Sequence, residues 1–326
     1  MRVVLLRGDG IGPEIARQAE RALLVLVPEV EIEDRLLGAQ AIRETGDPLP
    51  EATFESCRTA DAILKGPIGH PEFDAADVRP EQGLLRLRAA LDVYANLRPA
   101  RRGDVDLLIV RELVGGLYYG AQGVREDGTV FDTCEYHPAQ VERIARCGFE
   151  LAEARGGHVT SVDKANVLET SRMWRRVVTE LAGDYPGVTV EHMLVDNAAL
   201  QLVQAPERFD VIVTENMFGD ILSDEAAAVT GGLGLAGSAS LGAASPGIFE
   251  PVHGSAPDIA GSETANPAGM LRSTALLLRY GLRRPEQGQR LDEAVDRALA
   301  EAPTSDLGGS ASTSAFGDAV LAALAA

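Results

Sequence analysis

Two aspartates spaced four residues apart are the clearest candidates for metal binding in this sequence. Asp220 and Asp224 lie in Phe-Gly-Asp-Ile-Leu-Ser-Asp-Glu, after the expected strand Asp210–Thr214. In a helix this spacing places both carboxylates on one face, where a cation between them would relieve their repulsion. Oxygen ligands suit Mg²⁺ or Mn²⁺, and Asp196 could add a third carboxylate. The alternative is a solvated acidic helix face.

A lysine and a tyrosine are candidates for proton transfer. The chain has 28 arginines but only two lysines, Lys65 and Lys164. Lys164 stands between an acid and an amide at the end of the expected strand Val159–Val162, and a lysine, unlike an arginine, can serve as a general base. Tyr118 follows paired glycines, where a phenol could serve as a general acid. The alternatives are a solvated lysine and a tyrosine packed in the core.

Three arginines could bind the carboxylates of a substrate. Arg111 follows the expected strand Leu107–Val110, at the carboxyl end where open α/β sheets place ligands. Arg98 precedes Pro99, which would stop a helix, and Arg88 lies in Gly-Leu-Leu-Arg-Leu-Arg. A guanidinium group binds a carboxylate through two parallel hydrogen bonds. The alternative for each arginine is a surface ion pair.

Two glycine- and proline-rich segments are candidates for nucleotide contacts. Gly8–Pro13 reads GDGIGP between a strand and a helix, but the dinucleotide fingerprint requires glycine where Pro13 stands. We therefore expect a tight turn or an anion-binding turn, not a Rossmann site. Residues 249–261 are expected to form a loop that presents His253, Ser255 and Asp258. Asp258 could accept both ribose hydroxyls of an adenosine and would repel a 2′-phosphate.

The elements that position these residues alternate between strands and helices, which favours an α/β fold with a largely parallel sheet. The glycine-rich stretch Gly231–Gly247 is expected to form loops. The expected strands are Val3–Leu6, Ala62–Leu64, Leu107–Val110, Val159–Val162 and Asp210–Thr214. The expected helices start near Pro13 and cover Pro138–Ala154, Ser171–Leu181, Thr274–Tyr280 and Arg290–Ala302.

Composition excludes several classes of function. Among 326 residues, 49 are acidic and 30 are basic, for a net charge of −19. A field of that sign repels phosphate backbones and anionic lipids, so we expect neither nucleic-acid nor membrane partners. No segment approaches the roughly 18–20 apolar residues of a membrane helix, and the apolar start is too short for a signal peptide. The three cysteines form no CxxC pair, which favours reduced thiols and a cytoplasmic protein.

Taken together and in this order, the motifs resemble the β-decarboxylating dehydrogenases, the family of isopropylmalate, isocitrate, homoisocitrate and tartrate dehydrogenases. The resemblance covers nearly the whole chain. Within the family, residues 81–88, Glu-Gln-Gly-Leu-Leu-Arg-Leu-Arg, are most similar to the isopropylmalate enzymes. Leu84 and Leu85 would there meet an isopropyl group, whereas isocitrate enzymes carry polar residues. Arg111-Glu112-Leu113 before Val-Gly-Gly is also closer to the isopropylmalate pattern.

The resemblance implies an NAD-dependent, metal-dependent oxidative decarboxylation. Its expected substrate is 3-isopropylmalate, converted to 4-methyl-2-oxopentanoate and CO₂ in leucine biosynthesis. Another 2-hydroxy diacid remains the alternative, whether a different alkylmalate, tartrate, malate or homoisocitrate. A more distant alternative is an inactive scaffold with the same fold.

The resemblance also implies an architecture. It is the isocitrate/isopropylmalate dehydrogenase-like α/β fold, a large mixed sheet with helices on both faces, in two domains and without a Rossmann turn. Residues 1–95 plus 232–326 would form the nucleotide-binding domain. Residues 96–231 would form the central domain, with the metal and substrate residues and the dimer interface. In the expected homodimer, Lys164 and Asp196 of one subunit would complete the active site of the other.

Roles for individual residues follow from the same resemblance. Lys164 would help remove the hydroxyl proton and Tyr118 would protonate the enol carbon. The carboxylates of the substrate would bind Arg88, Arg98 and Arg111, and its alkyl group Leu84 and Leu85. The metal, Mg²⁺ or Mn²⁺, would bind Asp220, Asp224 and Asp196 of the partner subunit. The residues expected at NAD are Glu81, near the nicotinamide, and His253, Gly254, Ser255, Ala256, Asp258, Ile259 and Asn266, near the adenosine.

Three departures from the family pattern bear on substrate and cofactor. The segment after Arg98 is shorter than in typical isopropylmalate enzymes. Glu263-Thr264 replace a glycine and an apolar residue beside the expected adenine pocket. Glu215 stands where many relatives have a small residue. These departures leave open a specialised enzyme that acts on a different alkylmalate.

Overall fold

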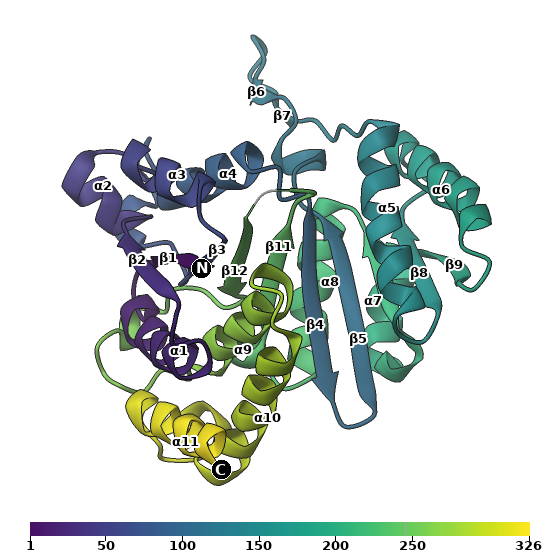
Figure 1. Cartoon of the computed structure of the whole chain (residues 1–326). Coiled ribbons are helices and arrows are strands. Elements are labelled where there is room, and N and C mark those ends of the chain that lie inside the picture. The colour runs from purple at the N-terminus through teal and green to yellow at the C-terminus, as the bar shows by residue number, and fades with distance from the viewer. Residues whose placement is uncertain (245) are drawn as a thin grey trace. The chain divides into compact units, whose positions relative to one another are not determined.

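Two compact units make up the chain, and each is described by itself. The structure, a computed structural model, describes residues 1–244 and 246–326. The terminal unit comprises Met1–Val93 and Leu233–Ala326, and the central unit comprises Tyr94–Gly232. Figure 1 labels the elements of both units.

Five strands of the mixed sheet belong to the terminal unit. They are β1 (Arg2–Leu6), β2 (Glu31–Arg35), β3 (Ala62–Lys65), β11 (Gly237–Leu241) and β12 (Gly247–Pro251), in the order β2-β1-β3-β12-β11. The first four in this order are parallel, and β11 and β12 pair antiparallel. The helices are α1 (Gly12–Leu26), α2 (Ala39–Thr45), α3 (Glu51–Arg58), α4 (Pro80–Ala90), α9 (Ala268–Leu276), α10 (Pro285–Glu301) and α11 (Thr313–Ala325).

The turn from β1 into α1 is tight because two glycines adopt positive φ angles. Gly8 has φ +75° and Gly10 has φ +57°, a region that other residues rarely occupy. A Cβ on Gly8 would lie 2.1 Å from the Pro67 carbonyl oxygen, and one on Gly10 would lie 2.0 Å from the Ser255 carbonyl oxygen. The GDGIGP segment therefore packs its backbone directly against neighbouring loops.

The central unit holds five further strands, β4 (Ala95–Arg102), β5 (Val105–Glu112), β8 (His158–Asp163), β9 (Thr189–Leu194) and β10 (Val211–Thr214). Their order is β4-β5-β10-β8-β9, with β4 and β5 antiparallel and the others parallel. A separate hairpin joins β6 (Gln122–Val124) to β7 (Val130–Asp132). The helices are α5 (Pro138–Glu153), α6 (Glu169–Leu181), α7 (Val195–Gln204) and α8 (Asn216–Val229).

Helices cover both faces of the central sheet (Figure 1). On one face α7 and α8 pack against each other and against a core that includes Leu107, Ile109 and Leu222. On the other face α5 packs against β5, β8 and β10. Strand β10 is buried throughout and β5 is buried from Leu107 onward, and their apolar runs Leu107–Val110 and Val211–Val213 are as expected for strands that are covered on both sides.

All five expected strands are present, but two expectations about loops are wrong. The stretch Gly231–Gly247 contains β11, whose serines Ser238 and Ser240 are buried. The Ser238 hydroxyl donates to the Glu250 carbonyl at 3.1 Å, which lets a polar residue occupy a buried strand. The first residues of the expected loop 249–261 belong to β12.

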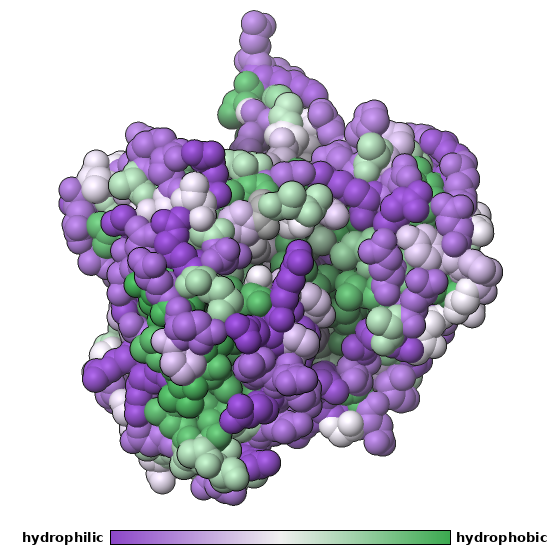
Figure 2. Space-filling model, in the orientation of Figure 1, coloured by the Kyte–Doolittle hydropathy of each residue, from purple (hydrophilic) through white to green (hydrophobic). Residues whose placement is uncertain are grey.

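The surface in Figure 2 is largely hydrophilic, and its apolar atoms gather at the lower left, where Figure 1 shows α1 and α11. Leu24 and Val25 of α1 are among the exposed apolar residues of the terminal unit. Among the described residues, no helix is both long and apolar enough to cross a membrane.

Candidate active site

The two aspartates of α8 lie beside two arginines rather than on a solvated acidic face. Burial of Phe218, Leu222 and Ala226 fixes the orientation of α8. Arg98, on β4, donates to Asp224 Oδ1 at 3.0 Å and to Asp220 Oδ1 at 3.4 Å. Arg111 donates to the same Asp220 oxygen. The helix therefore brings Asp220 and Asp224 together, as their spacing predicts.

The pKa values of Asp220 and Asp224 are shifted in opposite directions. Although burial opposes the effect, Arg111 and Arg98 lower the pKa of Asp220. Burial raises the pKa of Asp224, and the neighbouring Asp220 adds to this increase despite Arg98. Asp220 therefore loses its proton at a lower pH than Asp224.

Arg111 is a buried residue of β5, only 2% exposed, so it is not a surface ion pair. The Asn216 side-chain oxygen, at the start of α8, accepts from Arg111 Nε at 3.0 Å and from a terminal nitrogen at 2.7 Å. The Asn216 amide in turn donates to the carbonyls of Leu113 and Gly115, both at 3.0 Å. This chain of hydrogen bonds fixes the guanidinium next to Asp220.

Tyr118 lies in the same cluster and is not packed in the core, since 38% of the residue is exposed. Its hydroxyl donates to Asp220 Oδ2 at 3.0 Å. Burial and the adjacent Asp220 raise the pKa of Tyr118, so the phenol holds its proton at neutral pH. The preceding Gly116 has φ +72°, and a Cβ there would lie 2.5 Å from the Tyr136 hydroxyl.

Lys164 and Asp196 form a second cluster in the central unit. Lys164 directly follows β8, as expected, and its ammonium donates to the carboxylate of Asp196 in the first turn of α7. Lys164 lowers the pKa of Asp196. No group of three metal-ligating residues exists among the described residues, so Asp196 does not join Asp220 and Asp224 within one chain.

The remaining expected substrate residues lie on α4 of the terminal unit. Leu84 and Leu85 are half-buried, and Glu81 is exposed. Arg88 lies one turn after Leu84, and its side chain is 12% exposed. Its guanidinium donates to Glu250 Oε1 at 2.7 Å. Sequence reasoning missed Glu250, and it noted Lys65, which also binds Glu250, only for its rarity.

The expected adenosine residues follow β12 in the terminal unit. Ser255 is buried; its hydroxyl donates to the Gly69 carbonyl at 2.7 Å, and its own carbonyl accepts from the Ile11 amide at 2.8 Å. The Asn266 side-chain oxygen accepts a hydrogen bond from the Ala268 amide at 3.0 Å. The loop is thus fastened at both ends.

The middle of this loop presents groups that a ligand could contact. The buried His253 Nε2 has no hydrogen-bond partner among the described residues. A Cβ on Gly254 would meet nothing within 4 Å. Ala256 has φ +39°, and Asp258 and Ile259 are exposed. These features fit an adenosine ribose, with Asp258 as acceptor of its hydroxyls.

Glu263 and Glu215, the two acidic residues that depart from the family pattern, both accept hydrogen bonds. Glu263 accepts from the Ser314 amide at 3.1 Å and from its hydroxyl at 2.6 Å, so its side chain fastens the start of α11. Glu215 is buried, and the Cys134 thiol donates to it at 3.6 Å.

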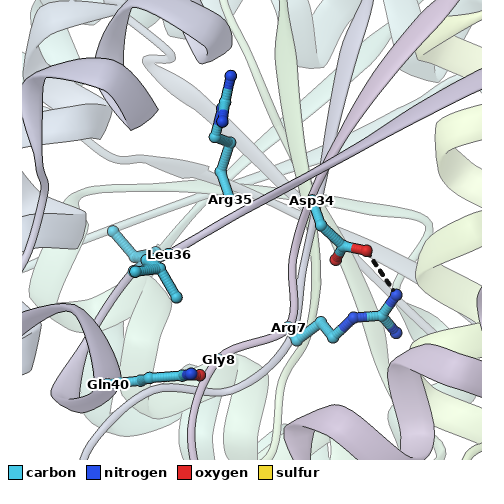
Figure 3. Close-up of a pocket in the computed structure, with 7 residues that line it drawn as sticks. Arg7, Gly8, Asp34, Arg35, Leu36 and Gln40 are labelled. Carbon is cyan, nitrogen blue, oxygen red and sulfur yellow. Dashed lines mark hydrogen bonds and ion pairs between the residues drawn. The ribbon is translucent and has the colours of Figure 1, made fainter. Parts of the chain in front are cut away.

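One further cavity contains none of the residues to which the family resemblance assigns a role. It measures about 230 Å³ and lies at the carboxyl ends of β1 and β2, lined by Arg7, Gly8, Asp34, Arg35, Leu36, Leu37 and Gln40 (Figure 3). Arg7 and Asp34 pair there at 2.7 Å, so the positive charge of Arg7 is already balanced.

Comparison with known proteins defines the class. Residues 2–320 match the family model described as isocitrate/isopropylmalate dehydrogenase. The "3-isopropylmalate dehydrogenase" of Zymomonas mobilis is 51% identical and aligns over 99% of this chain and its own full length. That of Bacillus subtilis is 48% identical over 99% of this chain and 97% of its own.

Solved structures of the same family have a similar fold. The isocitrate dehydrogenase of Methylococcus capsulatus superposes with a TM-score of 0.92 at 35% identity, over 99% of both chains. A β-decarboxylating dehydrogenase of Thermococcus kodakarensis superposes with a TM-score of 0.87 at 38% identity, over 99% of this chain and 96% of its own. The fold is thus that of the β-decarboxylating dehydrogenases. The chain belongs to the isocitrate/isopropylmalate dehydrogenase family, which confirms the resemblance, the fold class and the dehydrogenase class that the motifs predict.

Proposed function

We propose that this protein oxidises and decarboxylates 3-isopropylmalate with NAD⁺, giving 4-methyl-2-oxopentanoate and CO₂ for leucine biosynthesis in the cytoplasm. Full-length relatives that carry the name 3-isopropylmalate dehydrogenase support this activity. The choice of substrate rests on the positions of Leu84, Leu85 and Arg88 along α4. Leu84 and Arg88 are four residues apart and share one helix face, so a carboxylate bound to Arg88 places its neighbouring alkyl group at the leucines.

Isocitrate is the competing substrate, because a structural relative carries that name. Isocitrate would place a third carboxylate beside Leu84 and Leu85, whose side chains cannot form a hydrogen bond or an ion pair with it. Burial of an unpaired charge costs several kcal/mol, so this wall favours an alkyl group.

The oxygen donors Asp220 and Asp224, with Asp196 of the partner subunit, fit Mg²⁺ or Mn²⁺. A cation held by these carboxylates would polarise the C2 oxygen of the substrate, and NAD⁺ would take up the hydride. Arg98 and Arg111 form ion pairs with Asp220, and this proximity supports their proposed role in binding the malate carboxylates.

Proton transfers are assigned to two residues of the central unit. Lys164 in its neutral amine form accepts the proton of the C2 hydroxyl, and the ammonium that results donates to Asp196. Tyr118 donates its proton to the enol carbon after CO₂ has left. Its raised pKa keeps that proton available at neutral pH.

A homodimer with shared sites is part of the proposal. Within one chain Lys164 and Asp196 form a cluster of their own, and the described residues of that chain supply no third metal ligand. The helices α7 and α8, which carry Asp196 and Asp220, also expose the apolar side chains of Leu200, Val203 and Ile221. A second copy that packs on these helices would bury the apolar side chains and bring Lys164 to the partner's aspartates.

NAD⁺ rather than NADP⁺ is the expected cofactor. Asp258 is exposed and binds no cationic side chain among the described residues, so a 2′-phosphate would meet an uncompensated carboxylate. Glu81 is proposed to lie near the nicotinamide.

The experiment is an assay for NADH together with identification of the 2-oxo acid product from 3-isopropylmalate and Mg²⁺. The wild-type protein should give both products. Lys164→Met should still bind NAD⁺ but should lose oxidation by several orders of magnitude. Absence of NADH from the wild type with 3-isopropylmalate, when another diacid is oxidised, would refute the assigned substrate.

A further inference from the structure

A buried charge cluster in the terminal unit contains a lysine that the proposed reaction does not use. Lys65 ends β3 and is 1% exposed, and Glu250, on the adjacent β12, is 6% exposed. The lysine donates to Glu250 Oε2 at 2.7 Å and to the Gly66 carbonyl at 2.8 Å. Removal of a lysine and a glutamate from water is costly, so a pair buried to this degree requires an explanation beyond stability.

The third member of the cluster is Arg88. Its guanidinium binds Glu250 Oε1 at 2.7 Å, so the two oxygens of Glu250 are divided between two cations. Lys65 and Arg88 outweigh the effect of burial and lower the pKa of Glu250 to about 2, which keeps it ionised. Lys65, Arg88 and Glu250 together carry a net charge of +1, and the buried Asp9 lies near enough to Lys65 to stabilise its positive charge.

We propose that Lys65 is a positioning residue for Arg88. By occupying one oxygen of Glu250, it restricts Arg88 to the other oxygen, and by balancing the charge of Glu250 it preserves the net positive charge that receives a substrate carboxylate. Without Lys65, Glu250 could bind Arg88 through both oxygens, as guanidinium–carboxylate pairs prefer. The resulting pair would be neutral and would attract a substrate carboxylate less strongly. The inference rests on the proposed role of Arg88 in substrate binding.

The test compares steady-state kinetics of two variants with the wild type. Lys65→Met should raise KM for 3-isopropylmalate about tenfold while kcat changes little, because carboxylate binding is weakened and the reacting groups are untouched. The double variant Lys65→Met with Glu250→Gln removes one charge of each sign and should return KM to within about threefold of the wild type. A merely structural role for Lys65 would lower the melting temperature and leave KM unchanged.

Arg86→Met is the matched control, since Arg86 lies on the same helix, is exposed, and pairs with Asp47 instead. It also removes one positive charge and should leave KM unchanged. If Lys65→Met does not fold, Lys65→Gln replaces it, and its KM should rise in the same direction because the positive charge is lost.

Wild-type KM in a folded Lys65 variant, or no recovery in a folded double variant, would overturn the inference. Failure of the proposed function is distinguishable, because the wild type itself would then not oxidise 3-isopropylmalate. The same comparison would in that case use the diacid that the wild type does oxidise.

Discussion

Glu112 gives a quantitative prediction about stability and pH. It ends β5 and is fully buried, and it accepts from the backbone amides of Val114 at 3.2 Å and Gly115 at 2.8 Å, in the turn that leads to Tyr118. Burial raises the pKa of Glu112 to about 7, although these amides and Arg143, at 4.0 Å, oppose the increase.

The folded protein therefore retains a proton that the unfolded chain, with a carboxyl pKa near 4.5, has already lost. Stability should fall as the pH rises from about 4.5 to about 7 and should level off above that value. At about 1.4 kcal/mol for each pH unit between the two pKa values, the loss is about 3 kcal/mol.

The variant Glu112→Gln cannot ionise, but it still presents an oxygen to the two amides. It should exceed the wild type in free energy of unfolding by about 3 kcal/mol near pH 8 and by less than about 1 kcal/mol near pH 5. Urea unfolding can be followed by the fluorescence of Trp174, the only tryptophan, which is buried in the central unit. Glu126→Gln, at an exposed position of the same unit, controls for the change in net charge. A difference between Glu112→Gln and the wild type that does not grow with pH would refute the reasoning.

Three further predictions concern other parts of the chain. Burial raises the pKa of Cys147 to about 12, so iodoacetamide should label it far more slowly in the native than in the unfolded protein near pH 8, and equal rates would contradict this. Glu263→Ala removes the acceptor for Ser314 at the start of α11 and should cost about 1 kcal/mol in urea unfolding, whereas an unchanged midpoint would show that the contact is unimportant. A mixed dimer of Lys164→Met and Asp220→Asn chains should recover one working site of two, and a verified heterodimer without activity would exclude shared sites.

Local sequence signals predicted the features whose partners lie nearby in the chain. The i, i+4 spacing of Asp220 and Asp224 was sufficient to place them together on α8, and the apolar strand before Lys164 was sufficient to place it at the end of β8. Family resemblance, not spacing, supplied the roles of these residues.

Features that depend on distant partners could not be read from local patterns. β11 was missed because its small and polar residues are typical of loops, and only its pairing with β12 makes a strand there favourable. β4 was also missed, because it contains Pro99, and proline is uncommon inside strands. Glu250 gave no signal of its own, because Lys65 and Arg88 reach it from elements far away in the sequence.

The measurement that tests the central claim most directly is the ratio of kcat/KM for 3-isopropylmalate, malate and isocitrate with NAD⁺ and Mg²⁺. Three additional carbons against Leu84 and Leu85 contribute roughly 0.8 kcal/mol each, or about 2 kcal/mol in total. We therefore expect 3-isopropylmalate to exceed malate by about 30-fold, and isocitrate to be a very poor substrate. Equal efficiency with malate, or a preference for isocitrate or tartrate, would contradict the assignment and place the chain with another substrate of the same family.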